Sequence, residues 1–99
     1  MPAYLVVSRI GPLKDAEQFA EYQRKTRANP PPVRLRPLVV YGEIEALEGE
    51  APDAVVMLQF DSVEDAKAWY NHPAYQDALP HRLKAGEYRA FIVQGLEKA

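Results

Sequence analysis

Four short apolar runs, rich in β-branched residues, divide the chain. They cover residues 4–7, 38–41, 54–60 and 90–93. Short runs of this composition are typical of β-strands. Several of these runs are apolar at consecutive positions, which places apolar side chains on both faces of the predicted sheet. Both faces of the sheet therefore need a cover.

Two of the intervening segments carry the signals that start a helix. Asp15 is followed three residues later by Gln18, which is the arrangement of an N-cap, and the helical pattern continues to about Ala28. Ser62 is a second N-cap candidate, and acidic residues follow it in the first turn, where the helix dipole favours them. We therefore expect one helix from residue 15 to about residue 28 and another that starts at Ser62 and carries Trp69.

A third helical segment follows directly. Pro73 stands where a new helix would place its first residue after His72, and apolar residues then recur every three to four positions as far as Leu83. Pro80 lacks a backbone N–H and clashes with the preceding turn. We therefore expect Pro80 to interrupt this segment, leaving two short helices or one kinked helix.

The order of the predicted elements is β-α-β-β-α-β. This order predicts an α+β, ferredoxin-like fold, in which the helices cover one face of a four-stranded antiparallel sheet. The other face would stay bare, and an apolar face of that size exceeds what a monomer usually exposes. We therefore expect a homodimer in which the open sheet faces of two copies pack together.

The length and the charge of the chain limit the number of domains and the kinds of binding partner that we expect. The chain has 99 residues, so we expect one domain over residues 1–99, because a domain typically holds about 100–150 residues. Its 12 basic and 14 acidic residues give a net charge of −2, which provides no overall attraction for nucleic acid or anionic lipid. No signal-like or membrane-length apolar stretch occurs. We expect no nucleic-acid partner, no membrane partner and a cytoplasmic location.

Two segments carry charge of one sign. Residues 24–36 contain five basic residues and no acidic one, around a proline run at 30–32, whereas residues 43–53 contain five acidic residues and no basic one. In one interpretation, both segments are solvated surfaces that offset each other. In the other, the basic segment forms a rim that attracts an anionic small molecule to a pocket.

Motifs spread over nearly the whole chain occur in a distinctive combination. They are residues 2–7, Glu21-Tyr22, residues 42–49, and the segment Ala-Trp-Tyr-Asn-His-Pro-Ala-Tyr at 68–75. This combination resembles an uncharacterised bacterial domain-of-unknown-function family, of the Trp-Tyr-Asn/Ser-x-Pro-x-Tyr type, in the dimeric α/β-barrel, ferredoxin-like superfamily. The resemblance implies a protomer whose sheet joins that of a second copy in a barrel. It implies no reaction, because the family has no established one.

The recurring positions of this family correspond to residues on the predicted helices and turns. They are Tyr22, Glu48-Gly49, Trp69-Tyr70, Pro73 to Tyr75, and Arg82. The chain departs from the family around the second strand. Relatives approach this strand through a Gly-containing turn and carry an Arg ahead of a Gly-Gly pair, whereas this chain has the proline run and Val40-Tyr41-Gly42. If that Arg binds an anion in relatives, this chain has either lost it or replaced it with Arg34 or Arg36, and we would expect a different ligand. The superfamily also contains proteins that hold haem through a single His.

The residue types exclude several kinds of site. The chain has no Cys, and its five glycines are isolated, so it has no phosphate-binding loop or dinucleotide fingerprint. Ser62 is explained as an N-cap and no nucleophile elbow occurs, so a triad hydrolase is not expected. His72 and His81 lie nine positions apart, which matches no common metal-ligand spacing, so no metal site is expected. Glu48 before Gly49 fits a turn better than a catalytic carboxylate.

The candidate catalytic residues are His81 and Arg82. A cation next to an imidazole tends to keep it neutral near pH 7, as a general base requires. His81 would therefore act as the base, and Arg82 would hold an anionic group or an oxyanion. The candidate ligand-binding residues are aromatic: Tyr22, Trp69, Tyr75 and Tyr41. Tyrosine hydroxyls near Trp and Arg would give a mainly apolar pocket with a few polar groups, which is the usual form of a small-molecule site.

Two functions are compatible with these features. The first is the binding or turnover of a small organic molecule, anionic if the basic residues bind it, in a pocket between helices and sheet and without a bound cofactor. The alternative is a non-catalytic dimeric structural or stress-associated module with no specific ligand.

Overall fold

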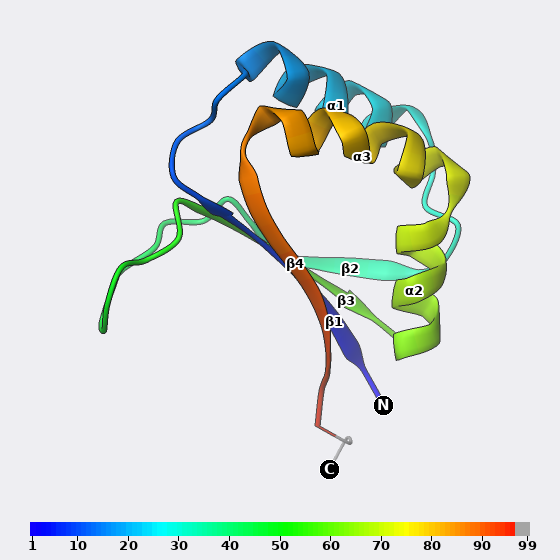
Figure 1. The fold of residues 1–99 in the computed structure, drawn as a ribbon. Coiled ribbons are helices and arrows are strands. Elements are labelled where there is room, and N and C mark those ends of the chain that lie inside the picture. Colours follow the sequence, from blue (N-terminus) through cyan, green and yellow to red (C-terminus); the bar gives the residue numbers. More distant parts are fainter. Residues whose placement is uncertain (97–99) are drawn as a thin grey trace.

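The computed structural model describes residues 1–96, which form four strands and three helices. These are β1 (Ala3–Ile10), α1 (Ala16–Ala28), β2 (Leu35–Val40), β3 (Ala54–Phe60), α2 (Val63–Asn71), α3 (Pro73–Ala85) and β4 (Glu87–Gln94) (Figure 1). The expected domain of residues 1–99 also includes residues 97–99, which lie outside the described part. All four predicted strands and the predicted helix starts are present.

The four strands form one antiparallel sheet in the order β2-β3-β1-β4. In the register of the central strands, Leu5 lies opposite Leu58 and Val7 opposite Val56, and Ile92 of β4 lies opposite Leu5 from the other side. Because side chains alternate along a strand, these residues share one face of the sheet. The α+β, ferredoxin-like fold predicted from the element order is confirmed.

Polar side chains start the helices as the sequence predicts. The Asp15 carboxylate accepts hydrogen bonds from the backbone N–H groups of Glu17 and Gln18 at the start of α1. The Ser62 hydroxyl accepts one from Asp65 at the start of α2. His72 ends α2 and caps α3, because its Nδ1 accepts a hydrogen bond from the backbone N–H of Ala74. The chain therefore changes direction at His72.

Pro80 does not divide α3 into two helices, so the expectation of two short helices was wrong, whereas a kink at Pro80 stays a prediction. The helix is continuous from Pro73 to Ala85 with Pro80 inside it. Pro80 and Gln76 both lie on the exposed side of α3. Because Pro80 has no N–H, the Gln76 carbonyl, four residues earlier, lacks its usual hydrogen-bond donor in the helix. That carbonyl can hydrogen-bond to water instead, which explains why the helix continues.

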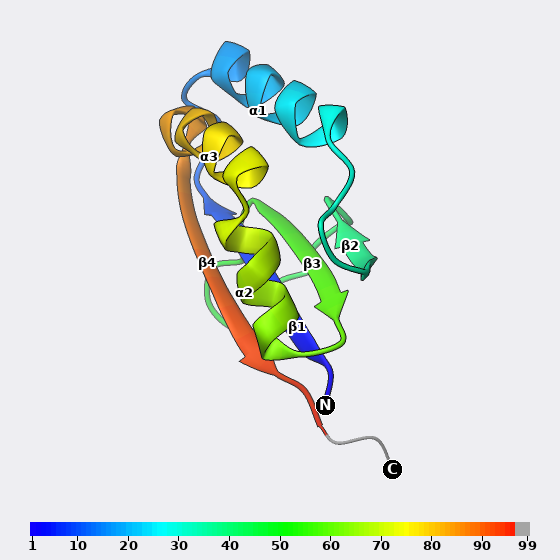
Figure 2. The same cartoon turned by 90° about the vertical axis from the view of Figure 1, so that its right-hand side faces the viewer.

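The three helices lie on one side of the sheet but do not cover it equally (Figure 2). α2 packs on β1, β3 and β4, and its Ala66 is buried against Leu5 and Phe60 in the core. α1 packs along α3 rather than on the strands, and none of its residues is buried. This arrangement leaves space between α1 and the sheet.

The opposite face of the sheet has no helix over it (Figure 1). Phe91 of β4 is 52% exposed and Val93 is 46% exposed, and both belong to this face because they alternate with Ile92. In the acidic segment 43–53, residues 43–50 and Asp53 are exposed, and the segment extends from the sheet as part of the loop between β2 and β3. No helix within residues 1–96 is long and apolar enough to cross a membrane.

Candidate functional site

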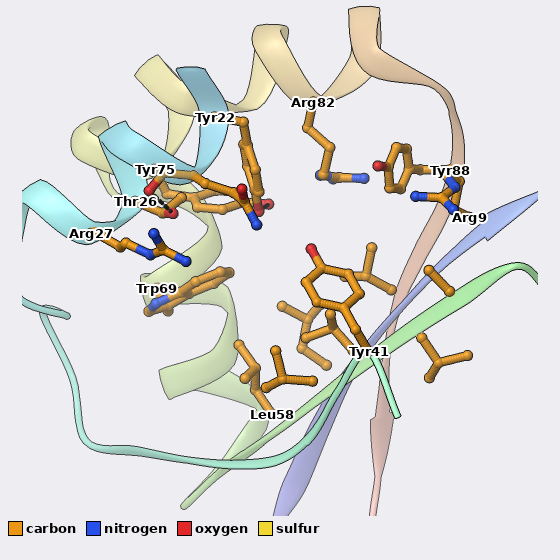
Figure 3. Close-up of a pocket in the computed structure, with 17 residues that line it drawn as sticks. Arg9, Tyr22, Thr26, Arg27, Tyr41, Leu58, Trp69, Tyr75, Arg82 and Tyr88 are labelled. Carbon is orange, nitrogen blue, oxygen red and sulfur yellow. Dashed lines mark hydrogen bonds between the residues drawn. The ribbon is translucent and has the colours of Figure 1, made fainter. Parts of the chain in front are cut away.

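An open-sided cavity of about 240 Å³ lies between α1, α3 and the helix-facing side of the sheet (Figure 3). Its floor is apolar, because Leu5 and Val7 of β1 and Val56 and Leu58 of β3 point into it. The cavity exists because α1 rests on α3 and does not close onto these strands. A concave, mainly apolar site with a few polar groups is the usual form of a small-molecule site.

All four predicted ligand-binding residues line this cavity: Tyr22, Tyr41, Trp69 and Tyr75. The hydroxyls of Tyr22 and Tyr75 are hydrogen-bonded at 3.0 Å, which joins α1 to α3. The rings of Trp69 and Tyr75 pack with centroids 4.3 Å apart. The structure thus brings these residues together around one space, and their binding of a ligand stays a prediction.

Tyr41 reaches the cavity through an unusual backbone conformation. The pairing of β2 with β3 shifts between Pro37 and Val39, and Tyr41, just after the strand, has a positive φ of 57°. Its backbone N–H donates to the carbonyl of Val55 at 3.0 Å, and its ring packs edge-on against Phe19 of α1 with a centroid distance of 6.0 Å. The Tyr41 hydroxyl points into the space below Arg82 (Figure 3).

Arg82 is the most unusual group of the site. It lies on α3, is 3% exposed, and extends toward the cavity (Figure 3). Among residues 1–96, no hydrogen-bond partner is found for its Nε and Nη1 atoms, and no carboxylate pairs with it. Its guanidinium carbon lies 5.9 Å from the ring centre of Tyr22 and 4.9 Å from that of Tyr88. Since an arginine stays protonated, this is a buried positive charge that only aromatic faces partly compensate.

The lining of the cavity is positively charged. Arg9, Arg27 and Arg82 line it, and none of the described residues around it is acidic. Arg9 donates from Nε to the carbonyl of Gly11 at 3.0 Å, and Arg27 is exposed. The Tyr88 hydroxyl is buried and has no partner within the described residues. The site therefore has hydrogen-bond donors and positive charge without an anion.

Two of the phenols that line the cavity, those of Tyr22 and Tyr41, have a raised pKa. Burial, followed by the proximity of Tyr75, raises the pKa of Tyr22 well above its usual value. Burial also raises the pKa of Tyr41. Both groups are therefore neutral at physiological pH, and neither adds negative charge to the site.

His81 lies at a different place from Arg82, although the two are neighbours in sequence. Its Nδ1 is 2.7 Å from the side-chain oxygen of Gln18, so its ring lies at the contact between α3 and α1. It is not among the residues that line the large cavity. Residues 81 and 82 point to different sides of α3, which a helix with 3.6 residues per turn requires. The catalytic role of His81 stays a prediction.

The described residues do not fit a haem or a metal ion in this cavity. Neither His81 nor His72 lines it, and the Nδ1 of His72 already accepts the capping hydrogen bond. Within residues 1–96, no group of three or more potential ligands from His, Cys, Asp and Glu is close enough to hold a metal ion.

Arg34 and Arg36 do not line the large cavity. They contribute with Gln59 and Asp61 to a separate polar depression of about 140 Å³ near β2, and both arginines are exposed. Glu48 lies in the exposed loop between β2 and β3, beside Gly49, whose φ is 68°. These positions agree with a turn at Glu48, and they do not place Arg34 or Arg36 at the mouth of the cavity.

Sequence reasoning missed Arg9 and Tyr88 of the site, whereas Arg27 belongs to the basic segment 24–36 that one interpretation placed at the rim of a pocket. Strand alternation could have found both missed residues, because Arg9 follows Leu5 and Val7 at every second position of β1, and Tyr88 shares a face with Ile92 on β4. An arginine in line with buried apolar residues of a strand was the available signal.

Solved structures share the fold at low sequence identity. A protein of unknown function from Rhodopseudomonas palustris is 18% identical, with a TM-score of 0.58 over 98% of this chain and 84% of that chain. An ethyl tert-butyl ether d (EthD) family protein from Bacillus halodurans is 14% identical, with a TM-score of 0.63 over 97% and 100% of the two chains. A dimeric protein of unknown function and ferredoxin-like fold from Bacteroides fragilis is 14% identical, with a TM-score of 0.54 over 95% and 96%. At these identities the similarity shows the fold alone.

The search of the curated proteins finds no match. The sequence profile of one family matches residues 2–96, nearly the whole chain. The resemblance inferred from the Trp-Tyr segment and its companion motifs is thereby confirmed at the level of an uncharacterised family. The chain belongs to the family described as Domain of unknown function (DUF1330).

Proposed function

We propose that the protein binds a small organic molecule in the cavity between α1, α3 and the sheet. The observation that carries this proposal is the buried Arg82 guanidinium, which faces an apolar cavity and has no anionic partner among the described residues. A buried charge is normally paired, because removal from water without a partner is unfavourable. A bound ligand would supply the missing partner.

Binding is compatible with a catalytic step that needs no bound cofactor. In such a step Arg82 would stabilise an anionic group, and His81 would act as a base. The ring of His81 contacts Gln18 at the helix contact, so a ligand would have to reach this point for direct proton transfer. His81→Ala should abolish turnover of any substrate found, and unchanged turnover would end that assignment.

Trp69 provides a direct test of binding. It is the only tryptophan of the chain and it lines the cavity, so its fluorescence should change when a ligand enters. We expect a saturable change with some members of a set of apolar and amphipathic fragments. If no fragment gives saturation at millimolar concentration, the module without a specific ligand becomes the better account.

A matched pair of substitutions locates the binding. Val7→Phe adds bulk to the floor of the cavity and should abolish the saturable signal. Leu83→Phe also introduces a phenyl ring, at a 58% exposed position of α3 that neither lines the cavity nor lies on the open sheet face, and should leave the signal intact. A signal that persists in Val7→Phe would place the ligand outside the cavity.

We also propose that two copies pair through the open sheet face. Its exposed Phe91 and Val93 support this, since monomers rarely expose such apolar patches, and the Bacteroides fragilis protein of similar fold is dimeric. Native mass spectrometry should give twice the chain mass. Phe91→Glu should give a monomer, whereas Leu83→Glu, a 58% exposed position on α3, should not. A wild-type monomer would refute the pairing.

A further inference from the structure

From the charges and shape of the cavity, we infer that its ligand is a small monocarboxylate with an apolar body about the size of one ring, held by Arg82. This inference rests on the proposed binding function and adds the chemical class of the ligand. It depends on three observations: the sign of the charge in the cavity, the donors around Arg82, and the apolar floor.

The charge of the cavity selects an anion. Arg9, Arg27 and Arg82 line it, and none of the described lining residues is acidic. Arg82 is the one of the three that is buried, and the guanidinium of arginine carries a positive charge in proteins. The rings of Tyr22 and Tyr88 contact its guanidinium but provide no full negative charge. A neutral ligand would leave this charge unpaired.

The donors near Arg82 fit a planar oxyanion. Nε and Nη1 of Arg82 and the hydroxyl of Tyr88 are buried without a hydrogen-bond partner in the described chain. The hydroxyl of Tyr41 points into the same space (Figure 3). A guanidinium and a carboxylate are both planar and form short, charge-assisted hydrogen bonds, and the phenol can donate to a carboxylate oxygen.

The surroundings favour one negative charge rather than two. Arg9 already donates to the Gly11 carbonyl, and Arg27 is exposed, so Arg82 is the buried cation among the described residues that line the cavity. A phosphate dianion would bring a second charge into a wall of tyrosine rings and aliphatic side chains. Because an unpaired buried charge is unfavourable, this second charge would weaken binding.

The rest of the cavity fits an apolar body. Leu58 and Trp69 lie away from Arg82, across the open space (Figure 3). The volume of about 240 Å³ is below the roughly 300–1,000 Å³ of sites for drug-sized ligands, which indicates a ligand of about one ring. The carboxylate would therefore lie against Arg82 and Tyr88, with the apolar body toward Trp69.

Pairs of probes that differ only in charge test the inference. Benzoate and phenylacetate would be compared at pH 7 with benzamide and phenylacetamide, which have almost the same shape and no charge. Toluene tests the apolar ring without a charge, and inorganic phosphate tests an anion without an apolar ring. Titrations would follow Trp69 fluorescence and heat of binding. We expect the acids to bind about 10- to 100-fold more tightly than the amides, as the loss of one or two charge-assisted hydrogen bonds implies.

Two substitutions on α3 provide the control. Arg82→Met keeps an unbranched apolar stem and removes the charge, so it should abolish the preference for acids and leave amide binding in place. Lys84→Met removes the same charge two residues later at an exposed position outside the cavity, and it should keep the preference. If the preference for acids is also lost in Lys84→Met, it arises from general electrostatic attraction, and the inference is overturned.

The remaining outcomes separate this inference from the proposed function. If amides and acids bind equally in the wild type, the cavity binds small molecules but the carboxylate assignment is wrong. If phosphate binds as tightly as the acids, the site recognises an anion without the apolar body, and the inference is also wrong. If no probe gives saturable binding, both the inference and the proposed function fail.

Discussion

Removing the charge of Arg82 should stabilise the unliganded protein, although most substitutions of buried residues destabilise. Arg82 is 3% exposed, and its Nε and Nη1 atoms have no hydrogen-bond partner within residues 1–96. Arg82→Met keeps much of the packing of the aliphatic stem and removes the unpaired charge. The substitution therefore isolates the energetic effect of burying this guanidinium without an anion.

The expected magnitude follows from two opposing effects. An ion buried without a partner is unfavourable by several kcal/mol in real proteins. The contacts with the rings of Tyr22 and Tyr88, at 5.9 and 4.9 Å, each offset about 0.5–2 kcal/mol of this. We expect Arg82→Met to raise the free energy of unfolding by about 1–3 kcal/mol. For a domain of this size, each kcal/mol corresponds to about 4–8 °C in melting temperature.

Urea unfolding followed by Trp69 fluorescence measures this effect, at one protein concentration and without ligand. Lys84→Met is the matched control and should change stability by less than about 0.5 kcal/mol, as expected for an exposed position. Adding a ligand at 100 times its dissociation constant should stabilise the wild type by about 2.7 kcal/mol. The same ligand concentration should have a much smaller effect on Arg82→Met.

One result would refute the reasoning. If Arg82→Met lowers the free energy of unfolding by more than about 1 kcal/mol while Lys84→Met does not, the guanidinium contributes to the fold in the unliganded protein. Arg82 would then be a structural residue, and its lack of a hydrogen-bond partner would no longer indicate a ligand.

Three further predictions concern residues of the helices and strands around the cavity. Burial raises the pKa of Tyr22 above the value of about 10 that tyrosine has in an unfolded chain, so the stability that depends on its neutral form is present below about pH 10 and is lost as the pH rises further. Tyr22→Phe should therefore flatten the alkaline loss of stability seen by calorimetry. Asp15→Ala should lower the free energy of unfolding by about 0.5–2 kcal/mol in urea titrations, because it removes the N-cap of α1. Tyr41→Gly should be more stable than Tyr41→Ala by about 1 kcal/mol in the same assay, because both lack the ring and only glycine adopts a φ of 57° without strain. The reverse order would show that this backbone conformation is not retained.

Local signals in the sequence were sufficient for most of the fold. Asp15 and Ser62 mark the helix starts because capping depends on residues within one turn, and His72 before Pro73 marks the junction between α2 and α3. The failure at Pro80 has a physical reason. Whether proline ends a helix depends on whether the released carbonyl can meet water, and this requires knowing that Gln76 faces outward.

The site was predictable only where residue type indicated it. Aromatic residues on helices suggested a pocket, and Tyr22, Trp69 and Tyr75 do meet around one. The helical repeat alone separates His81 from Arg82, but which of the two lines the cavity depends on how α3 is rotated against α1 and the sheet. No local pattern encodes that rotation.

The composition of α1 explains why a cavity exists at all. Among its 13 residues, only Phe19 and Tyr22 are large and apolar or aromatic, so the helix has too little apolar surface to close onto the sheet. Three side-chain hydrogen bonds join it to α3: Tyr22 with Tyr75, Gln18 with His81, and Lys25 with Asp77 at 2.6 Å.

An open cavity and an unpaired buried arginine are both unfavourable for the unliganded fold. In a module selected only for stability, neither feature would be expected. One larger apolar residue on α1 would fill the cavity, and a methionine at position 82 would remove the unpaired charge. The two features lie in the same place, where Arg82 meets the space that α1 leaves open. A ligand that fills the cavity and pairs with the guanidinium accounts for both at once, which is why binding explains this structure better than an inert dimeric module.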